Sequence, residues 1–314
     1  MPAPIVLQTE HLNVHYGDHH ALKDLNISIN EGELVAVIGP NGAGKTSFIK
    51  ALCGRIKPDG VMKVGEKLLK RGGDRRRHIG LVPQDIGLYP HLSASENLHV
   101  IAKLLRVPRA DRLAAINDAI KAVGMEDKAD ALVETLSGGM KRRINVAAAI
   151  MHDPAIIIFD EPTAGVDTPA RDVVHRLART LAERGMAVIL VTHELEQAEA
   201  LCDKVLVLFD GATLAFDTPS RILNSSFAGA REVVVRFTVA PDAQTLAAMR
   251  PFAFEQGEMP TVWVATTQAN EVSFVSAFMT ALRGGNEIIR EITVRRPGLN
   301  SLMHRIEQTG QIGS

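Results

Sequence analysis

The sequence predicts an α/β protein with a parallel sheet at its centre, followed by a smaller α+β domain. Short apolar runs at 156–159 and 188–191 are typical of buried parallel strands. Strand-like and helix-like segments alternate across 155–208, as crossover connections require. The chain has 314 residues, of which 46% are hydrophobic. That is enough for one large core and a satellite domain.

Charge and cysteine usage exclude several classes of protein. The formal net charge is -1 at pH 7, so we expect no nucleic-acid partner. We expect the basic runs 75–77 and 141–143 to be solvated surface. Cys53 and Cys202 lack the spacing of a metal site or a disulfide framework. We interpret them as buried or half-buried thiols in a reducing compartment.

No segment has the pattern of a membrane anchor or a leader peptide. Residues 1–5 contain no basic stretch followed by an apolar run. No apolar run approaches the roughly 18 residues that a membrane-spanning helix needs. We therefore expect a chain that is soluble by itself, so that any role at a membrane requires a partner.

The secondary structure of the first domain, 1–225, is predicted from the spacing of apolar residues and from residues typical of helix ends. Residues 5–38 are expected to form strands, in an antiparallel N-terminal β-subdomain, and a helix should run from about Gly44 to Cys53. Further short strands are expected in 61–82. A helical subdomain should span about 93–151, because Ser93 and Glu96 have capping-box spacing before an apolar stripe. The remaining expected elements are strands near 155–159, 187–192 and 204–208, with helices near 168–184 and 194–202.

The second domain is expected to cover 226–314. Small residues at 225–230 suggest a linker. Beyond it, strand-like and helix-like segments alternate, which predicts a small α+β domain. The expected strands are 233–237, 261–265 and 288–294, and the expected helices are 242–250, 271–283 and one near the C-terminus.

One glycine-rich segment fits a phosphate-binding loop. Gly39, Gly44, Lys45 and Thr46 stand at the spacing G-x-x-x-x-G-K-[ST], between an expected strand and an expected helix. The glycines allow several backbone N–H groups to face one polyphosphate at the helix N-terminus. Lys45 should reach the β- and γ-phosphates, and the Thr46 hydroxyl should bind Mg²⁺.

A second element supplies acid groups. Residues 156–159 are apolar and lead into Asp160 and Glu161 at the strand's carboxyl end, where α/β sheets bind ligands. Asp160 is placed to hold Mg²⁺. Glu161 is placed to orient, or take a proton from, an attacking water; a role in capping the next segment is the alternative.

The segment Leu136–Met140, with the sequence LSGGM, resembles the signature of ATP-binding-cassette (ABC) proteins. Met140 replaces the glutamine that is commoner there. The resemblance covers roughly residues 5–225, and it implies an ABC ATPase core that binds ATP with Mg²⁺. The remaining residues that the resemblance implicates are Tyr16 stacked on adenine; Pro40, Asn41, Gly42, Ala43 and Ser47 in the phosphate loop; Gln84 at Mg²⁺ and the attacking water; Ser137 and Gly139 at a partner's γ-phosphate; Asp167 in the dimer-contact loop; and His193 at the γ-phosphate.

The resemblance also implies partners. Two cassettes sandwich two ATP molecules, and intact motifs favour a homodimer over pairing with a second, different cassette. An integral membrane permease subunit would dock on the helical subdomain, which places the chain at the inner face of the cell membrane, in the cytoplasm.

Two further segments, 88–98 and 287–306, resemble the branch of the family that exports drugs, polysaccharides and ions. Asn300 and Ser301 stand where acidic residues are common in that branch. An importer ATPase and a soluble non-transport ABC factor remain open. Amino-acid importer cassettes usually lack such a tail, and the soluble factors carry two cassettes or a long coiled coil.

Overall fold

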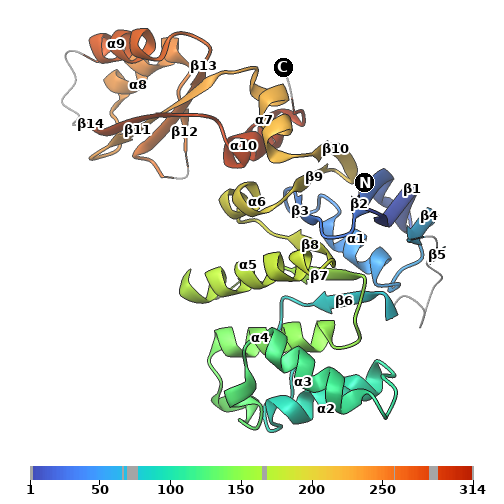
Figure 1. Ribbon diagram of the computed structural model, residues 1–314. Coiled ribbons are helices and arrows are strands. Elements are labelled where there is room, and N and C mark those ends of the chain that lie inside the picture. The colour runs from blue at the N-terminus through green and yellow to red at the C-terminus, as the bar shows by residue number, and fades with distance from the viewer. Residues whose placement is uncertain are drawn as a thin grey trace. The chain divides into compact units, whose positions relative to one another are not determined.

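A computed structural model of the protein describes residues 3–65, 67–68, 77–164, 168–257, 259–282 and 289–312. The chain divides into two compact units, Met1–Pro219 and Ser220–Ser314. Figure 1 shows their elements.

The first unit is built on one ten-stranded sheet within the described residues, in the order β5-β4-β1-β2-β10-β9-β3-β8-β7-β6. The strands from β5 to β2 pair antiparallel, whereas β9, β3, β8, β7 and β6 pair parallel. The bounds are β1 (Ile5–Tyr16), β2 (His19–Asn30), β3 (Leu34–Ile38), β4 (Asp59–Val64), β5 (Lys67–Leu68), β6 (Ile79–Val82), β7 (Ile156–Asp160), β8 (Ala187–Val191), β9 (Lys204–Phe209) and β10 (Ala212–Asp217).

Helices of this unit fall where the apolar periodicity predicts them. They are α1 (Lys45–Leu52), α2 (Ala94–Leu104), α3 (Arg112–Ala122), α4 (Gly138–Ile150), α5 (Thr168–Glu183) and α6 (Leu195–Leu201), with 3₁₀ turns η2 (Glu126–Lys128) and η3 (Val133–Thr135). The Ser93–Glu96 capping box is present at the start of α2. Helices α2, α3 and α4 pack on one another and form the expected helical subdomain (Figure 1).

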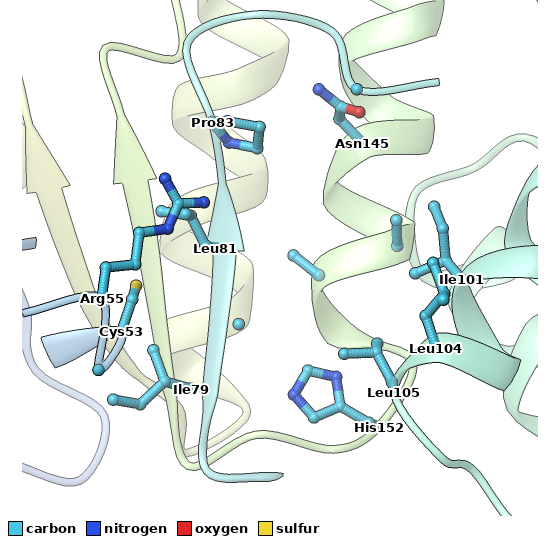
Figure 2. A pocket seen from close by; sticks show the side chains of 15 residues that line it. Cys53, Arg55, Ile79, Leu81, Pro83, Ile101, Leu104, Leu105, Asn145 and His152 are labelled. Atoms are coloured by element: carbon cyan, nitrogen blue, oxygen red, sulfur yellow. The ribbon is translucent and has the colours of Figure 1, made fainter. Parts of the chain in front are cut away.

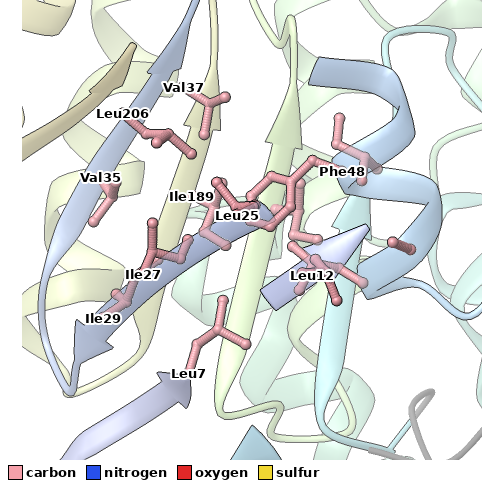
Figure 3. Close-up of a cluster of buried hydrophobic side chains, with 14 of the residues drawn as sticks. Leu7, Leu12, Leu25, Ile27, Ile29, Val35, Val37, Phe48, Ile189 and Leu206 are labelled. Carbon is pink, nitrogen blue, oxygen red and sulfur yellow. The ribbon is translucent and has the colours of Figure 1, made fainter. Parts of the chain in front are cut away.

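One hydrophobic core joins the antiparallel and the parallel parts of this sheet. Side chains of β1 and β2, of α1 and of the parallel strands share a single buried cluster. Phe48 of α1 lies among them, fully buried, as Figure 3 shows. The antiparallel strands therefore cover α1, and α1 is fixed in place directly after the expected phosphate loop.

The second unit has a four-stranded antiparallel sheet, ordered β12-β13-β11-β14, within the described residues. Phe252, Phe254, Phe274 and Phe278 pack ring against ring beside it. The bounds are α7 (Pro219–Phe227), β11 (Arg231–Phe237), α8 (Ala243–Met249), η4 (Arg250–Phe252), β12 (Glu255–Gln256), β13 (Val262–Thr267), α9 (Glu271–Ala281), β14 (Ile289–Arg295) and α10 (Leu299–Thr309).

The linker expected at 225–230 is wrong, because its first half, 225–227, is the end of α7. The hydroxyls of Ser225 and Ser226 donate to the Ile222 carbonyl, at 2.9 and 2.6 Å, so these polar residues fit a helix. Ile222 and Phe227 are buried. Small residues at this point thus reflect the last turn of a packed helix. Strand β10 is a second element that the sequence pattern did not predict.

The expected burial of the two cysteines is confirmed, and the expected exposure of the run 75–77 is confirmed at Arg77 alone. Cys53 is half-buried and Cys202 is buried, and the two do not form a disulfide. Arg75 and Arg76 lie outside the described residues, while Arg77 is exposed. Within the described ranges, none of the helices combines the length and apolar character needed to cross a bilayer.

The aromatic cluster gives a stability prediction for the second unit. Phe278 is fully buried, so Phe278→Ala should lower the free energy of unfolding of residues 220–314 by about 3–5 kcal/mol. Trp263 is the only tryptophan in the chain and packs on this cluster, so its fluorescence during urea unfolding reports this unit. On the same helix Val272 is 77% exposed, and Val272→Ala should change stability by less than about 0.5 kcal/mol. Equal effects of the two substitutions would contradict this core.

Candidate functional site

The glycine-rich loop connects the end of β3 to the start of α1. Gly39 has φ 152°, and a Cβ there would lie 2.2 Å from the Leu208 carbonyl oxygen. A side chain is therefore excluded at the point where the loop leaves the sheet. Gly44, with φ 106°, is the N-cap of α1. The N-terminus of α1 and the loop amides form the kind of positive site that binds phosphate.

Lys45 lies over this loop. Its Nζ donates to the carbonyl oxygens of Gly39 and Pro40, at 2.6 and 3.0 Å. Burial lowers the pKa of Lys45, while the charges of Glu161 and Asp160 oppose that shift. The loop's cation thus interacts electrostatically with both acid groups that the sequence singled out.

Asp160 and Glu161 stand at the carboxyl end of β7. Burial raises the pKa of Asp160, the Glu161 charge raises it further, and Arg55 and Lys45 act in the opposite direction. Glu161 has φ 46°, which costs a non-glycine residue about 1 kcal/mol. Its amide donates to the Val191 carbonyl at 2.9 Å. This bond ties Glu161 to the neighbouring strand in an otherwise unfavourable conformation.

His193 follows β8, the strand next to β7. Its Nδ1 lies 3.5 Å from Glu161 Oε1, and the ring is largely exposed. The two residues meet because β7 and β8 are parallel, with Asp160 paired to Val191. The phosphate loop follows β3, which pairs parallel with β8. The structure therefore brings Lys45, Asp160, Glu161 and His193 to one edge of the sheet.

Tyr16 ends β1 and is exposed by 41%. Lys50 of α1 places its Nζ 5.9 Å from the centre of the Tyr16 ring. The aromatic ring therefore lies beside the helix that carries the phosphate loop. Within that helix and loop, Asn41, Gly42 and Thr46 are exposed, Ala43 and Ser47 are buried, and Pro40 is half-buried.

The signature residues occupy the N-terminus of α4. Ser137 is the N-cap, and its Oγ accepts from the Met140 amide at 3.3 Å. Gly139 lies against α5, where an added Cβ would be 2.9 Å from the Ala170 Cβ. Ser137 and Gly138 are exposed. Asp167 lies outside the described residues.

Gln84 is exposed, in the segment that follows β6. Its backbone carbonyl accepts from Arg142. The expectation that 141–143 is solvated surface is therefore wrong for Arg142, which is only 3% exposed. The sequence held one sign of this contact. Arg142 and Asn145 are three residues apart, which places both polar side chains on the same face of α4.

A second group was also missed. Glu194 follows His193 directly, and its carboxylate lies 3.1 Å from Arg171 and 3.4 Å from His175, both on α5. His175 is buried, which lowers its pKa, while the Glu194 and Asp172 charges oppose the shift and Arg171 adds to it. Glu194, the residue next to His193, is thus anchored to α5.

Comparison with known proteins identifies the family. The family model described as "ABC transporter" matches residues 22–164. The chain is 35% identical over 237 residues to the linearmycin resistance ATP-binding protein LnrL of Bacillus subtilis, covering 75% of each protein. It is 32% identical over 273 residues to the Nod factor export ATP-binding protein I of Ralstonia nicotianae, covering 84% of this chain and 85% of the relative. This chain belongs to the ABC transporter family.

Solved structures agree in fold. The cbiO1 protein of Clostridium perfringens, described as part of an ABC transporter complex, aligns with a TM-score of 0.65 and 29% identity, over 70% of this chain and 90% of that one. The ATP-binding cassette MJ0796, described as a dimer bound to ADP and Pi, aligns with a TM-score of 0.58 and 27% identity, over 68% and 98%. The chain is thus an ATP-binding and ATP-hydrolysing subunit, and the expected ABC core fold is confirmed.

The phosphate loop yields a direct test. Lys45→Ala should lower Mg²⁺-dependent phosphate release from ATP about 100-fold or more, because it removes the cation held over the loop. Lys57 is exposed just beyond α1, so Lys57→Ala is the matched loss of one positive charge and should leave turnover within about twofold. Comparable turnover in the Lys45 and Lys57 variants would refute the assignment of this loop.

Proposed function

We propose that this ABC subunit energises export through a separate membrane permease, and that it works as a homodimer at the inner face of the cell membrane. The proposal of a permease partner rests on an apolar pocket beside the segment that contains Gln84. The export direction is supported by the relatives, which are named for Nod factor export and linearmycin resistance.

The pocket has a volume of about 530 Å³ and lies between the sheet and the helical subdomain. Figure 2 shows β6 and the end of α1 on one side, with α2 and α4 on the other. Its large apolar lining residues are Ile79, Leu81, Ile101, Leu104 and Leu105. Leu104 is 65% exposed, and Ile86 and Tyr89 nearby are also exposed. An apolar groove of this size suits an amphipathic helix from a membrane subunit.

The catalytic roles we propose follow from the sheet edge. Lys45 and the loop amides of 39–47 would bind the β- and γ-phosphates, with Tyr16 stacked on adenine. Glu161 would accept the proton of the attacking water, and His193 would donate to the γ-phosphate. Asp160 has a raised pKa because it is buried beside Glu161, so a cation there would be favourable. Thr46, Asp160 and Gln84 would hold Mg²⁺, which neutralises charge on the phosphate oxygens.

The homodimer is supported by where the signature lies. Ser137 is exposed at the N-terminus of α4, and the dimeric MJ0796 cassette has the same fold. We propose that Ser137, Gly139 and Asp167 complete the ATP site of a second copy. Because each site would then need both subunits, ATP would hold the dimer closed and hydrolysis would release it.

The division of labour between the two parts of the chain is also proposed. Residues 1–219 would carry the nucleotide chemistry, and 220–314 would form an accessory domain, which moves the boundary expected at 225 to the start of α7. Every group named above lies in the first part, and the aromatic cluster beside the second sheet gives that part a core of its own.

The permease groove is tested by a charge placed on its rim. Leu104→Glu should reduce, by about tenfold or more, the integral membrane protein that co-purifies with the chain from detergent extracts, because it buries a charge in an apolar contact. Leu113 is 62% exposed on α3, outside the pocket lining, so Leu113→Glu is the control and should leave co-purification unchanged. Equal loss in both variants, or no loss in either, would argue against docking at this pocket.

The dimer is tested by trapping ATP. Glu161→Gln removes the base and keeps the shape of the side chain, so bound ATP should persist. This variant should elute as a dimer with ATP and as a monomer with ADP in size-exclusion chromatography. Adding Ser137→Arg should restore the monomer by blocking the bridging position. A Glu161→Gln protein that stays monomeric at saturating ATP would count against the homodimer.

A further inference from the structure

Arg142 is a buried cation that the nucleotide chemistry described so far does not use. It lies on α4, just over one turn after Ser137. Its Nη1 donates to the Pro83 carbonyl and its Nη2 to the Gln84 carbonyl, each at 2.7 Å. Burial lowers the pKa of the guanidinium, and the charge of Asp85 opposes that shift. Its buried Nε has no hydrogen-bond partner in the described part of the chain, so the two terminal nitrogens supply the polar anchoring.

The next turn of the same helix continues this contact. Asn145 donates from Nδ2 to the Asp85 carbonyl at 3.3 Å. Three consecutive carbonyls, at 83–85, are therefore held by two side chains of α4. Residues 83–87 belong to neither a helix nor a strand, so no ladder of backbone bonds fixes them. The rigid planar fork of an arginine holds two neighbouring carbonyls in a way that a single donor does not reproduce.

The neighbouring arginine has a different role. Arg143 donates to the carbonyls of Val123 and Gly124, at 3.2 and 3.0 Å. It therefore ties α4 to the end of α3 inside the helical subdomain. The two arginines have the same chemistry and similar carbonyl partners, but only Arg142 reaches the Gln84 segment.

We propose that Arg142 is a positioning residue for Gln84: it fixes the backbone at 83–84 to α4, so that the direction of the Gln84 side chain follows this helix. The inference rests on the proposed role of Gln84 at the nucleotide. Helix α4 also begins at the signature, and Pro83 and Asn145 line the permease pocket near one end (Figure 2). A displacement of α4 by either partner therefore reaches Gln84 through one buried guanidinium.

Steady-state kinetics test this role with Arg143→Gln as the matched control. Arg142→Gln should lower kcat for ATP about tenfold, since a small misplacement of a catalytic group has effects of this order. The KM for ATP should stay within about twofold, because the phosphate loop and Tyr16 are untouched. Arg143→Gln should change neither constant by more than about twofold. A loss of kcat that is the same in both variants, or a kcat of Arg142→Gln equal to wild type, overturns the proposal.

A double-mutant cycle separates positioning from a general structural effect. If Arg142 acts through Gln84, then Arg142→Gln should lower kcat no further in a Gln84→Ala background. Additive losses overturn the proposal. A Gln84→Ala protein with wild-type kcat would refute the proposed role of Gln84 instead, so the two failures are distinguishable.

Hydrogen exchange provides a readout that is independent of activity. In the full-length protein without nucleotide, Arg142→Gln should speed exchange of the amides at 84–88, and Arg143→Gln should not. Unchanged exchange in Arg142→Gln overturns the proposal. If Arg142→Gln lacks a cooperative thermal transition, Arg142→Lys replaces it throughout. That variant keeps the charge but spans only one carbonyl, and it should show the same kcat loss and faster exchange.

Discussion

The parallel pairing of β3, β8 and β7 is the constraint on which the rest of the site depends. These strands run side by side, so their carboxyl ends lie along one edge. The phosphate loop, the two carboxylates and the histidine come from distant parts of the sequence, and each follows one of these strands. The sheet therefore brings a cation, two acids and an imidazole together through the backbone pairing of the strands that precede them. The common core under α1 keeps the loop in register with the acids.

Several groups at this edge are held in unfavourable states by the fold around them. Glu161 keeps a left-handed backbone, tied to β8 by its amide. Burial lowers the pKa of Lys45 and raises the pKa of Asp160, and the charge of each residue opposes the shift of the other. Such an arrangement favours a highly charged ligand, because a polyphosphate with its metal ion satisfies both the cation and the acids.

Helix α4 connects three parts of the first unit. Its N-terminus carries the signature, its buried face holds the carbonyls at 83–85, and Asn145 lines the apolar pocket. The same helix thus borders the surfaces proposed for two different partners and the segment that contains Gln84. The Arg171–Glu194 ion pair forms a comparable link between α5 and the residue beside His193. Both links consist of side chains that join a loop to a helix.

The sequence by itself determined the phosphate loop, the acidic strand, both ends of α1 and the start of α2, because these depend on local spacing, glycine conformation and capping. It also supported the family, since the signature and its companions lie in a fixed order. Only the tertiary structure decided that Ser225 and Ser226 end a packed helix and that Arg142 is buried while Arg143 stays half-exposed. Periodicity places Arg142 on a face of α4 but does not say what covers that face. Burial is decided by which distant segment packs there. The segment at 83–85 meets α4 through its backbone carbonyls, which every residue has and which therefore leave no pattern in a sequence.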